Sequence, residues 1–217
     1  MQIRDLGLLE YRATWKIQEE VHADVLAGGE EQLLLVEHPP VITLGRRPGL
    51  QKHILASSAE LTDRGVDVVE TDRGGEATFH GPGQLVAYPI VRLADHHLSV
   101  SGYVHLLEKI TVRTLSDLGI EAFTDPKAVG VWAQNLSSAS KTSSKIAAIG
   151  VRIRRGVSMH GLAINVNTDL SFFDLIVPCG IAGQQVTSIL NLLGKDTPTI
   201  ANVKEKLTCR LINSMIR

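Results

Sequence analysis

Hydrophobic residues recur every three or four positions in three long stretches of the chain, which is the spacing of an amphipathic helix. They predict helices over residues 11–26, 100–118 and 200–216. The middle stretch stops at Gly119, and glycine commonly follows the C-terminus of a helix. Two shorter helices are expected, one beginning near a serine cap at Ser57 and one over residues 186–193.

Between these stretches, short apolar runs bounded by glycine, proline or charged residues predict strands. The runs lie at residues 32–37, 41–44, 66–71, 85–91, 129–133, 146–153 and 158–166. We expect the first two to pair around His38-Pro39-Pro40, and the last two to form a hairpin across Arg154-Arg155-Gly156. Strands joined by short turns, with long helices between them, predict an α+β (two-layer α/β) fold with a mixed, largely antiparallel sheet. No repeat or linker divides the chain, so we expect a single domain over residues 1–217.

Composition and charge narrow the function classes. Apolar residues make up 44% of the chain, enough for one sizeable core. Its 22 basic and 23 acidic residues give a net charge of −1, which argues against a nucleic-acid partner. No apolar run approaches the roughly 20 residues of a membrane span, and the first residues lack the pattern of a signal peptide. With only two cysteines, we expect a cytoplasmic protein with reduced thiols and no membrane partner.

Cys179 lies in the segment Val-Pro-Cys-Gly-Ile-Ala-Gly, where glycines on its C-terminal side allow a tight turn with free backbone N–H groups. A thiol in such a turn can act as a nucleophile if its surroundings lower its pKa from about 8.5. The alternative is a buried structural cysteine. Cys209, on the expected last helix, has no such turn and is interpreted as structural.

Lys145 stands between a serine-rich stretch, residues 135–144, and the expected strand 146–153. The stretch fits neither a helix nor a strand period and predicts a surface loop. At its edge the lysine could stabilise a thiolate and carry a proton, or it could be a solvated surface charge. Because 34 positions separate it from Cys179, only tertiary structure could bring the two together.

A polar, glycine-rich stretch occupies residues 73–84, with the sequence RGGEATFHGPGQ. Its glycines could cradle a phosphate or leave room for an apolar ligand, but their order fits neither common nucleotide-binding loop. His80 could be catalytic or simply hydrogen-bonded within the loop. A metal site is disfavoured because the histidines are scattered and no CxxC or HExxH motif occurs. Arg152, Arg154 and Arg155 could meet an acidic partner protein or form a solvated hairpin tip.

Three ordered blocks make the chain similar to a known family. Residues 73–89, RGGEATFHGPGQLVAYP, resemble the signature of the lipoyl(octanoyl) transferases. The run from Lys145 to Asn167 resembles the lysine segment and following strand of that family, and Pro178-Cys179-Gly180 resembles its cysteine segment. Lys141 is the alternative lysine, but the sequence that follows Lys145 directly favours Lys145.

The resemblance implies a biotin/lipoate protein ligase-like core and transfer of an octanoyl group from octanoyl-acyl carrier protein to a lysine of a lipoyl domain. The acceptors it implies are the E2 subunits of 2-oxoacid dehydrogenases and the H protein of glycine cleavage. Cys179 would carry the acyl group as a thioester, with Lys145 as its activating and proton-transfer partner. No cofactor, ATP or metal is implied. The implied substrate-binding residues are Arg73, Gly74, Gly75, Glu76, Ala77, Thr78, Phe79, His80, Ala148, Ile149, Gly150, Gly161, Leu162 and Ala163.

Two other functions remain open at this point. An ATP-dependent lipoate or biotin ligase of the same fold would use its lysine against an acyl-adenylate and would need no cysteine nucleophile. A non-catalytic acyl-binding module would bind the chain without forming a thioester. The first differs from a transferase in its response to Cys179→Ser, and the second in whether it becomes acylated.

Overall fold

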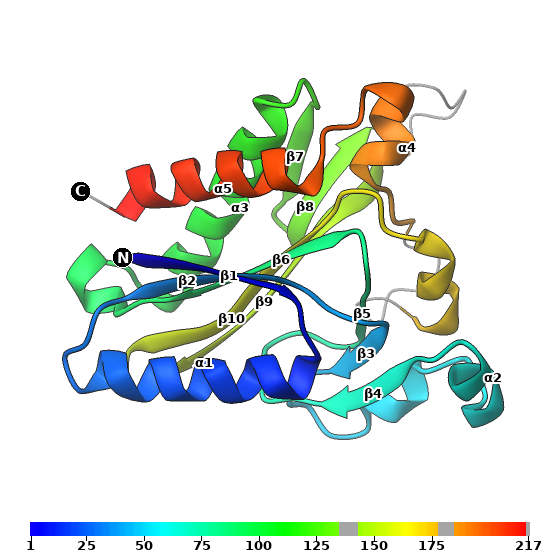
Figure 1. The fold of residues 1–217 in the computed structure, drawn as a ribbon, viewed down its shortest axis with the longest axis horizontal. Helices are drawn as coiled ribbons and strands as arrows, with labels where there is room; N and C mark the ends of the chain where they lie inside the picture. The colour runs from blue at the N-terminus through cyan, green and yellow to red at the C-terminus, as the bar shows by residue number, and fades with distance from the viewer. Residues whose placement is uncertain (135–142, 178–184, 216–217) are drawn as a thin grey trace.

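The computed structural model describes residues 1–134, 143–177 and 185–215. Its centre is a seven-stranded sheet made of β1 (Gln2–Leu8), β2 (Gln32–Glu37), β6 (Gln84–Ile90), β7 (Ala122–Asp125), β8 (Ala128–Gln134), β9 (Ser143–Arg154) and β10 (Val157–Asn165). The strand order is β1-β2-β6-β10-β9-β8-β7 (Figure 1). Within this sheet β1 pairs with β2 in parallel, and the other neighbouring pairs of strands are antiparallel. The predicted mixed, largely antiparallel sheet is therefore confirmed.

A second sheet of three strands has the order β4-β3-β5 and consists of β3 (Val41–Leu44), β4 (Asp67–Glu70) and β5 (Thr78–His80). The predicted pairing of residues 32–37 with 41–44 is thus wrong, because β2 belongs to the large sheet and β3 to the small one. His38-Pro39-Pro40 redirects the chain between them. The prolines have no N–H to continue a ladder, and His38 is fixed by Nδ1, which donates to the Leu9 carbonyl at 2.7 Å.

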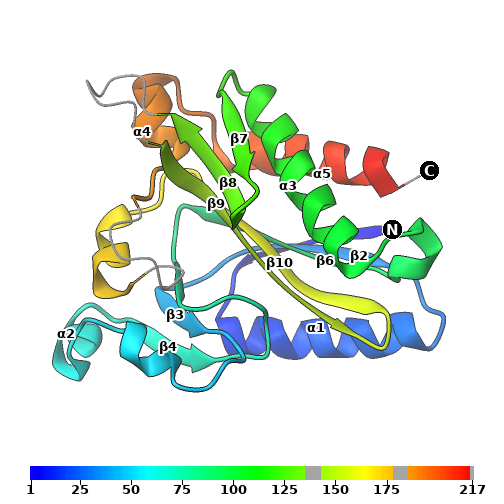
Figure 2. The same cartoon turned by 180° about the vertical axis from the view of Figure 1, so that it is seen from behind.

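Helices cover both faces of the large sheet (Figures 1 and 2). On one face lies α1 (Tyr11–Leu26), and on the other lie α3 (Val100–Ser116) and α5 (Ile200–Met215). The short α2 (Ser58–Asp63) begins after Ser57, whose hydroxyl accepts the Glu60 N–H as expected of a cap. These four predicted helices are confirmed, since their bounds differ by only a few residues from the apolar patterns.

The last short helix, α4 (Ile189–Leu193), begins three residues later than predicted. Val186 instead forms a parallel bridge with Lys145, and Thr187 donates its N–H to the Lys145 carbonyl at 2.9 Å. Ser188 then caps the helix through the Asn191 N–H. Val186 and Thr187 therefore extend the sheet rather than the helix.

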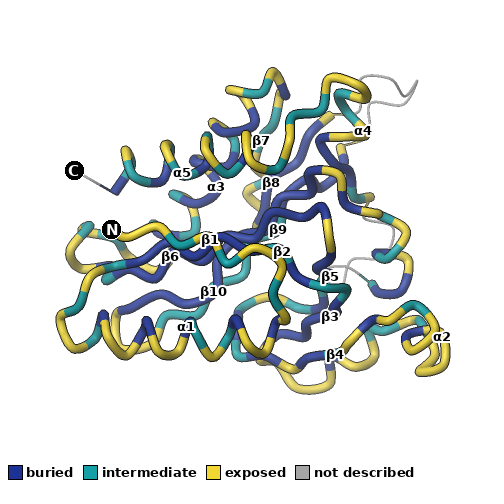
Figure 3. The backbone as a smooth tube through the Cα atoms, in the orientation of Figure 1, coloured by how far each residue is buried: buried dark blue, intermediate teal, exposed yellow. Residues whose placement is uncertain are grey.

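The core follows this layering, as the buried strands at the centre of Figure 3 show. The largest apolar cluster fills the space between the large sheet and α3 and α5. A second cluster lies under α1, where Val21 and Val25 pack on Val86 and Ala163. A third surrounds the small sheet, where the Phe79 ring stacks on Phe172 at 4.7 Å.

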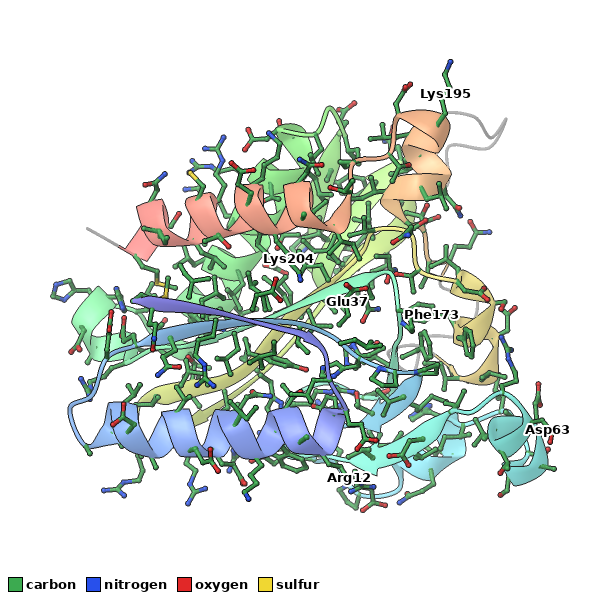
Figure 4. The ribbon with its side chains drawn as sticks, viewed as in Figure 1. Arg12, Glu37, Asp63, Phe173, Lys195 and Lys204 are labelled. Carbon is green, nitrogen blue, oxygen red and sulfur yellow. The ribbon has the colours of Figure 1, made fainter. Side chains whose placement is uncertain are left out.

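Polar contacts stabilise β1 and the end of β2. Lys204 of α5 reaches β1, where its Nζ lies 2.9 Å from an Asp5 carboxylate oxygen (Figure 4). At the far end of β2, the Glu37 carboxylate accepts the Gly83 N–H at 2.9 Å and so holds the turn that leads into β6. Within the described ranges, none of the helices combines the length and the apolar composition needed to cross a bilayer.

Candidate active site

A cavity of about 330 Å³ lies between the large sheet and the segment that leads into the small one. Its walls come from β6, β9 and β10 on one side and from residues 73–80 on the other. Val86, Ala148, Leu162 and Ala163 give it apolar surface. The size and the mixture of apolar walls with a few polar groups suit a small acyl group.

Most of the residues that the sequence singled out lie around this one cavity. The predicted residues in its lining are Arg73, Gly75, Glu76, Ala77, Thr78, His80, Lys145, Ala148, Ile149, Gly150, Gly161, Leu162 and Ala163. Gly74 and Phe79 are outside it. Gly74 donates its N–H to the Val151 carbonyl at 2.9 Å, and Phe79 packs in the core of the small sheet.

Other lining residues were not predicted. They are Tyr11, Arg47, Val86, Tyr88, Lys127, Ala128, Val129 and His160. Tyr88 and His160 lie within the sequence blocks that carry the family resemblance, and that was the available signal. Tyr11 and the 127–129 turn come from distant parts of the chain, and no local pattern marks them.

Arg73 shapes the wall formed by residues 73–80. Its guanidinium is buried and donates to the Thr43 carbonyl at 2.6 Å, to the Gly74 carbonyl at 2.9 Å and to the Glu76 carbonyl at 2.8 Å. A planar group with five donors can satisfy carbonyls in several directions at once. Arg73 therefore ties β3 to the cavity wall and fixes the path of the backbone there.

Replacing Arg73 with lysine should lower the free energy of unfolding by about 2–4 kcal/mol, because one ammonium cannot reach all of these carbonyls. The melting temperature should fall by roughly 2–4 °C for each kcal/mol. Arg47→Lys is the matched control, since the Arg47 side chain is 70% exposed and its bond to Glu76 is a surface ion pair. Thermal unfolding of both variants checks this, and equal melting temperatures would contradict the role of Arg73.

Two of the predicted glycines in the cavity walls also lie directly against neighbouring backbone. A Cβ on Gly161 would lie 2.1 Å from the Ala87 carbonyl oxygen, and one on Gly150 would lie 2.8 Å from the Gly74 carbonyl oxygen. Both sites are therefore closed by neighbouring backbone. These glycines allow strands and the 73–80 segment to approach closely, and the cavity is bounded by that packing rather than hollowed by missing side chains.

Two histidines near the cavity are held neutral chiefly by burial. His38 donates from Nδ1 to a carbonyl, so its Nε2 accepts the Tyr88 hydroxyl at 2.9 Å. His80 Nδ1 donates to the Gln84 side-chain oxygen at 2.6 Å. Burial lowers the pKa of His38 to about 4 and that of His80 to about 3. Neither is a general base whose pKa matches neutral pH, so His80 is best described as part of a neutral hydrogen-bonded wall.

A third histidine, His160, has a left-handed backbone conformation, with φ of 56°. Its Nε2 donates to Asp72 at 2.8 Å, and its Nδ1 lies 3.3 Å from the Tyr11 hydroxyl. Burial lowers the pKa of His160, against the opposing effect of Asp72, and burial raises the pKa of Tyr11 to about 12. These groups form a network that joins α1, β10 and the residue before Arg73 behind the cavity.

Acid should destabilise the fold through these histidines. In the unfolded chain a histidine binds a proton near pH 6.5, whereas folded His38 resists protonation until about pH 4. The unfolded state therefore binds more protons in that window, and the free energy of unfolding should fall by up to about 1.4 kcal/mol per pH unit for each such histidine. Urea unfolding at pH 7 and pH 5 measures this, with His38→Gln expected to reduce the slope. Equal stability at the two pH values would contradict the prediction.

Lys145 is not the loop-edge surface charge that one interpretation allowed. It is the third residue of β9 and only 6% exposed. In its ladder with β8, β9 carries a bulge: Val131 pairs with Ala147 and Trp132 with Lys145, which leaves Ile146 of β9 as an extra residue. Ile146 and Ala147 both face the main core. The bulge thereby turns Lys145 to the other face, where it lines the cavity.

Cys179 and the rest of residues 178–184 lie outside the described residues. Both ends of that segment are fixed near the cavity. Val177 donates its N–H to the His53 carbonyl at 2.8 Å, and Gln185 accepts the Lys145 N–H at 2.8 Å. Gln185, the first described residue after that segment, lies six positions after Cys179 in the sequence. The described residue that follows the cysteine segment is therefore hydrogen-bonded to Lys145.

Residues around the mouth of the cavity carry charge. Glu76 lies 3.3 Å from an Arg47 nitrogen and 3.4 Å from His53 Nε2, so the 73–80 wall is tied to residues 47–53, where the His53 carbonyl also accepts the Val177 N–H. Lys127 of the β7–β8 turn and the exposed Val129 of β8 also line the cavity. In the described ranges, no group of three or more histidine, cysteine or acidic side chains is arranged to hold a metal ion.

Two members of the predicted basic cluster, Arg154 and Arg155, are exposed at the tip of the hairpin, nine and ten residues beyond Lys145. The hairpin itself is confirmed, with Arg155 and Gly156 both at positive φ as a two-residue turn requires. Arg152 lies 3.8 Å from Asp72 and so belongs to the network behind the cavity.

Known proteins share this fold. The chain matches a bi-partite lipoate protein ligase from Thermoplasma acidophilum with a TM-score of 0.72 and 16% identity, over 99% of this chain and 84% of that one. It also matches a biotin protein ligase from Aquifex aeolicus, in complex with biotin and ATP, with a TM-score of 0.59 and 13% identity over 99% and 70% of the two chains. These matches confirm the predicted biotin/lipoate protein ligase-like core.

Sequence comparison is more specific. Residues 10–212 match the family model of the lipoyl protein ligase A/B catalytic domain. An octanoyltransferase from Chloroflexus aurantiacus is 46% identical over 213 residues, which is 97% of this chain and 92% of that protein. The predicted family and the predicted enzyme class, acyltransferase, are both confirmed. The chain therefore belongs to the octanoyltransferases, within the lipoyl protein ligase A/B catalytic domain family.

Proposed function

We propose that the protein moves an octanoyl group from octanoyl-acyl carrier protein to a lysine of a lipoyl domain, through a thioester on Cys179. Lys145 is the proton-transfer partner of that cysteine. The observation that carries this proposal is the position of Lys145, which lines an acyl-sized cavity while its backbone is hydrogen-bonded to the residue that ends the cysteine segment.

In the first step Lys145 takes the proton of the Cys179 thiol, and the resulting ammonium stabilises the thiolate. The thiolate attacks the carbonyl carbon of the octanoyl thioester. The bond to the carrier sulfur breaks, and that sulfur leaves with the proton from Lys145. Backbone N–H groups of the cysteine turn are the candidate donors to the developing oxyanion.

In the second step the amine of the acceptor lysine attacks the Cys179 thioester. Its proton passes to Lys145, which is neutral after the first step, while the bond from carbonyl carbon to Cys179 breaks. An amide forms on the acceptor and the Cys179 thiolate is restored. Since the donor is already an activated thioester, the two steps balance without nucleotide hydrolysis.

The cavity supports an acyl substrate of limited length. Each buried methylene contributes up to about 0.8 kcal/mol, so a chain that fills the cavity binds better than a shorter one. Neighbouring backbone packs directly against Gly150 and Gly161, which fixes the walls at these two positions.

The test is a transfer assay with purified octanoyl-acyl carrier protein and a lipoyl domain, each followed by intact-mass spectrometry. The proposal expects octanoyl mass on the lipoyl domain without ATP. As acceptors we propose lipoyl domains of 2-oxoacid dehydrogenase E2 subunits and the H protein of glycine cleavage. Modification that appears only with free fatty acid and ATP would instead identify a ligase. A loaded carrier that transfers nothing to protein or acceptor would identify a non-catalytic acyl-binding module.

A further inference from the structure

Two residues of β8 that no sequence motif marked surround the side chain of Lys145. Trp132 is its partner across the β8–β9 ladder, and the Lys145 Nζ lies 5.0 Å from the centre of the Trp132 indole ring. Gly130 lies two residues earlier, on the same face of the strand. All three residues are buried.

Gly130 occupies a position where no other residue fits beside the lysine. A Cβ built there would lie 2.4 Å from Lys145 Cε, 3.2 Å from Nζ and 2.8 Å from the Ala147 carbonyl oxygen. Its φ is 135°, which side chains rarely adopt. The space that the missing side chain leaves is therefore the space through which the end of Lys145 passes.

The strand is also held at this glycine from behind. The Gly130 N–H donates to the buried Glu108 carboxylate of α3 at 3.0 Å, and the second Glu108 oxygen accepts from His105 at 3.0 Å. A carboxylate bound in this way fixes the backbone at the position where the bulge interrupts the ladder. β8 is thus anchored to a helix at the point that faces the lysine.

Trp132 supplies the other half of the arrangement. An ammonium within about 6 Å of an indole face is attracted by the ring, and the attraction is stronger where water is excluded. The ring is 5% exposed. It would favour one position of Nζ over the many that a flexible four-carbon side chain can adopt.

We propose that Gly130 and Trp132 together fix the position of the Lys145 amine for its reaction, and that both are positioning residues of the enzyme. The proposal rests on the proposed function, because it assumes that Lys145 acts in transfer. It assigns the bulge, the glycine and the tryptophan to one purpose: the bulge turns the lysine to the cavity face, the glycine admits it and the indole fixes its end.

Gly130→Ala should lower the kcat for transfer roughly 100-fold, since an ångström of misplacement of a catalytic group costs about that much. The flexible end of Lys145 can move away from the new Cβ, whereas the Ala147 carbonyl oxygen is backbone and must also shift, so the melting temperature should fall as well. The kcat is therefore measured at a temperature at which thermal unfolding shows the variant to be folded. Trp132→Leu should lower kcat about 3- to 30-fold, the range of a lost cation–π contact, and Trp132→Phe less. KM for the carrier protein should change little in each case.

Gly156→Ala is the matched control. Gly156 also has a positive φ, of 83°, but a Cβ there meets nothing within 4 Å. It should show the cost of backbone strain alone, as a lower melting temperature with unchanged kcat. A Gly130→Ala variant whose melting temperature falls as much as that of Gly156→Ala, but whose kcat is unchanged, would overturn the proposal.

A double-mutant cycle with Lys145→Ala separates positioning from general damage. If Gly130 and Trp132 act through the lysine, their substitutions should have no further effect on kcat once Lys145 is alanine. In wild-type background they should also shift the pH midpoint of Cys179 alkylation in the same direction as Lys145→Ala does. Additive losses in the cycle, with an unshifted alkylation midpoint, would overturn the proposal. If Lys145→Ala alone leaves transfer unchanged, the proposed function fails instead.

Discussion

Replacing Cys179 with serine is expected to reduce octanoyl transfer by about 10³-fold or more. A serine hydroxyl remains protonated beside a lysine that can deprotonate a thiol, so the variant should form no acyl-enzyme at a useful rate. The measurement is the initial rate of octanoyl transfer from carrier protein to a lipoyl domain, with thermal unfolding as a check that the variant is folded.

Cys209 provides the matched control for this prediction. It is exposed on α5, where its sulfur accepts a hydrogen bond from the Asn213 side-chain nitrogen at 3.4 Å. It is not one of the residues that line the cavity. Cys209→Ser should therefore transfer at the wild-type rate. Transfer that survives Cys179→Ser but not Cys209→Ser would identify Cys209 as the nucleophile and contradict the proposal. Transfer that survives both substitutions would favour a ligase mechanism.

Replacing Lys145 with alanine is expected to lower transfer by roughly 10²–10⁴-fold, the range typical of a lost general acid–base group. The variant lacks the amine that is proposed to take the thiol proton and to stabilise the thiolate. The pH midpoint for alkylation of Cys179 should lie below that of a free thiol, about 8.5, in the wild type and should move upward in the variant. Iodoacetamide labelling followed over pH measures it.

Lys145→Arg separates the two roles of the lysine. Arginine keeps the positive charge but cannot accept a proton in a protein. The alkylation midpoint should therefore stay low while transfer to the acceptor amine is lost. Lys141→Ala, four residues upstream, should leave both properties unchanged. An alkylation midpoint that ignores Lys145 would remove this residue from the activating role.

Local patterns predicted the elements of this fold better than their connections. The apolar spacing of residues 11–26 and 100–118 is enough to find α1 and α3, because each helix buries one continuous face. The separation of β2 and β3 into different sheets was not predictable from two apolar runs. It depends on His38, whose ring contacts Leu9 and Tyr88 from other parts of the chain.

The candidate site shows the same division. The sequence identified Lys145, yet its burial depends on a bulge defined by the register between β8 and β9, which no single segment contains. The sequence also marked Gly150 and Gly161, and both line the cavity, but the backbone that a Cβ would meet at each belongs to other segments of the chain, which no local pattern identifies. Gly130 and Trp132 drew no attention because their significance lies in what faces them across the sheet.

The proposed mechanism requires an octanoyl thioester at Cys179. The most direct measurement is to mix the protein with octanoyl-acyl carrier protein without acceptor, quench with acid, and locate the added mass by peptide mapping. One octanoyl group on the peptide that contains Cys179, released by neutral hydroxylamine as thioesters are, is the predicted result. An octanoyl group on Lys145, or an unmodified enzyme under conditions where a lipoyl domain is acylated, would contradict it.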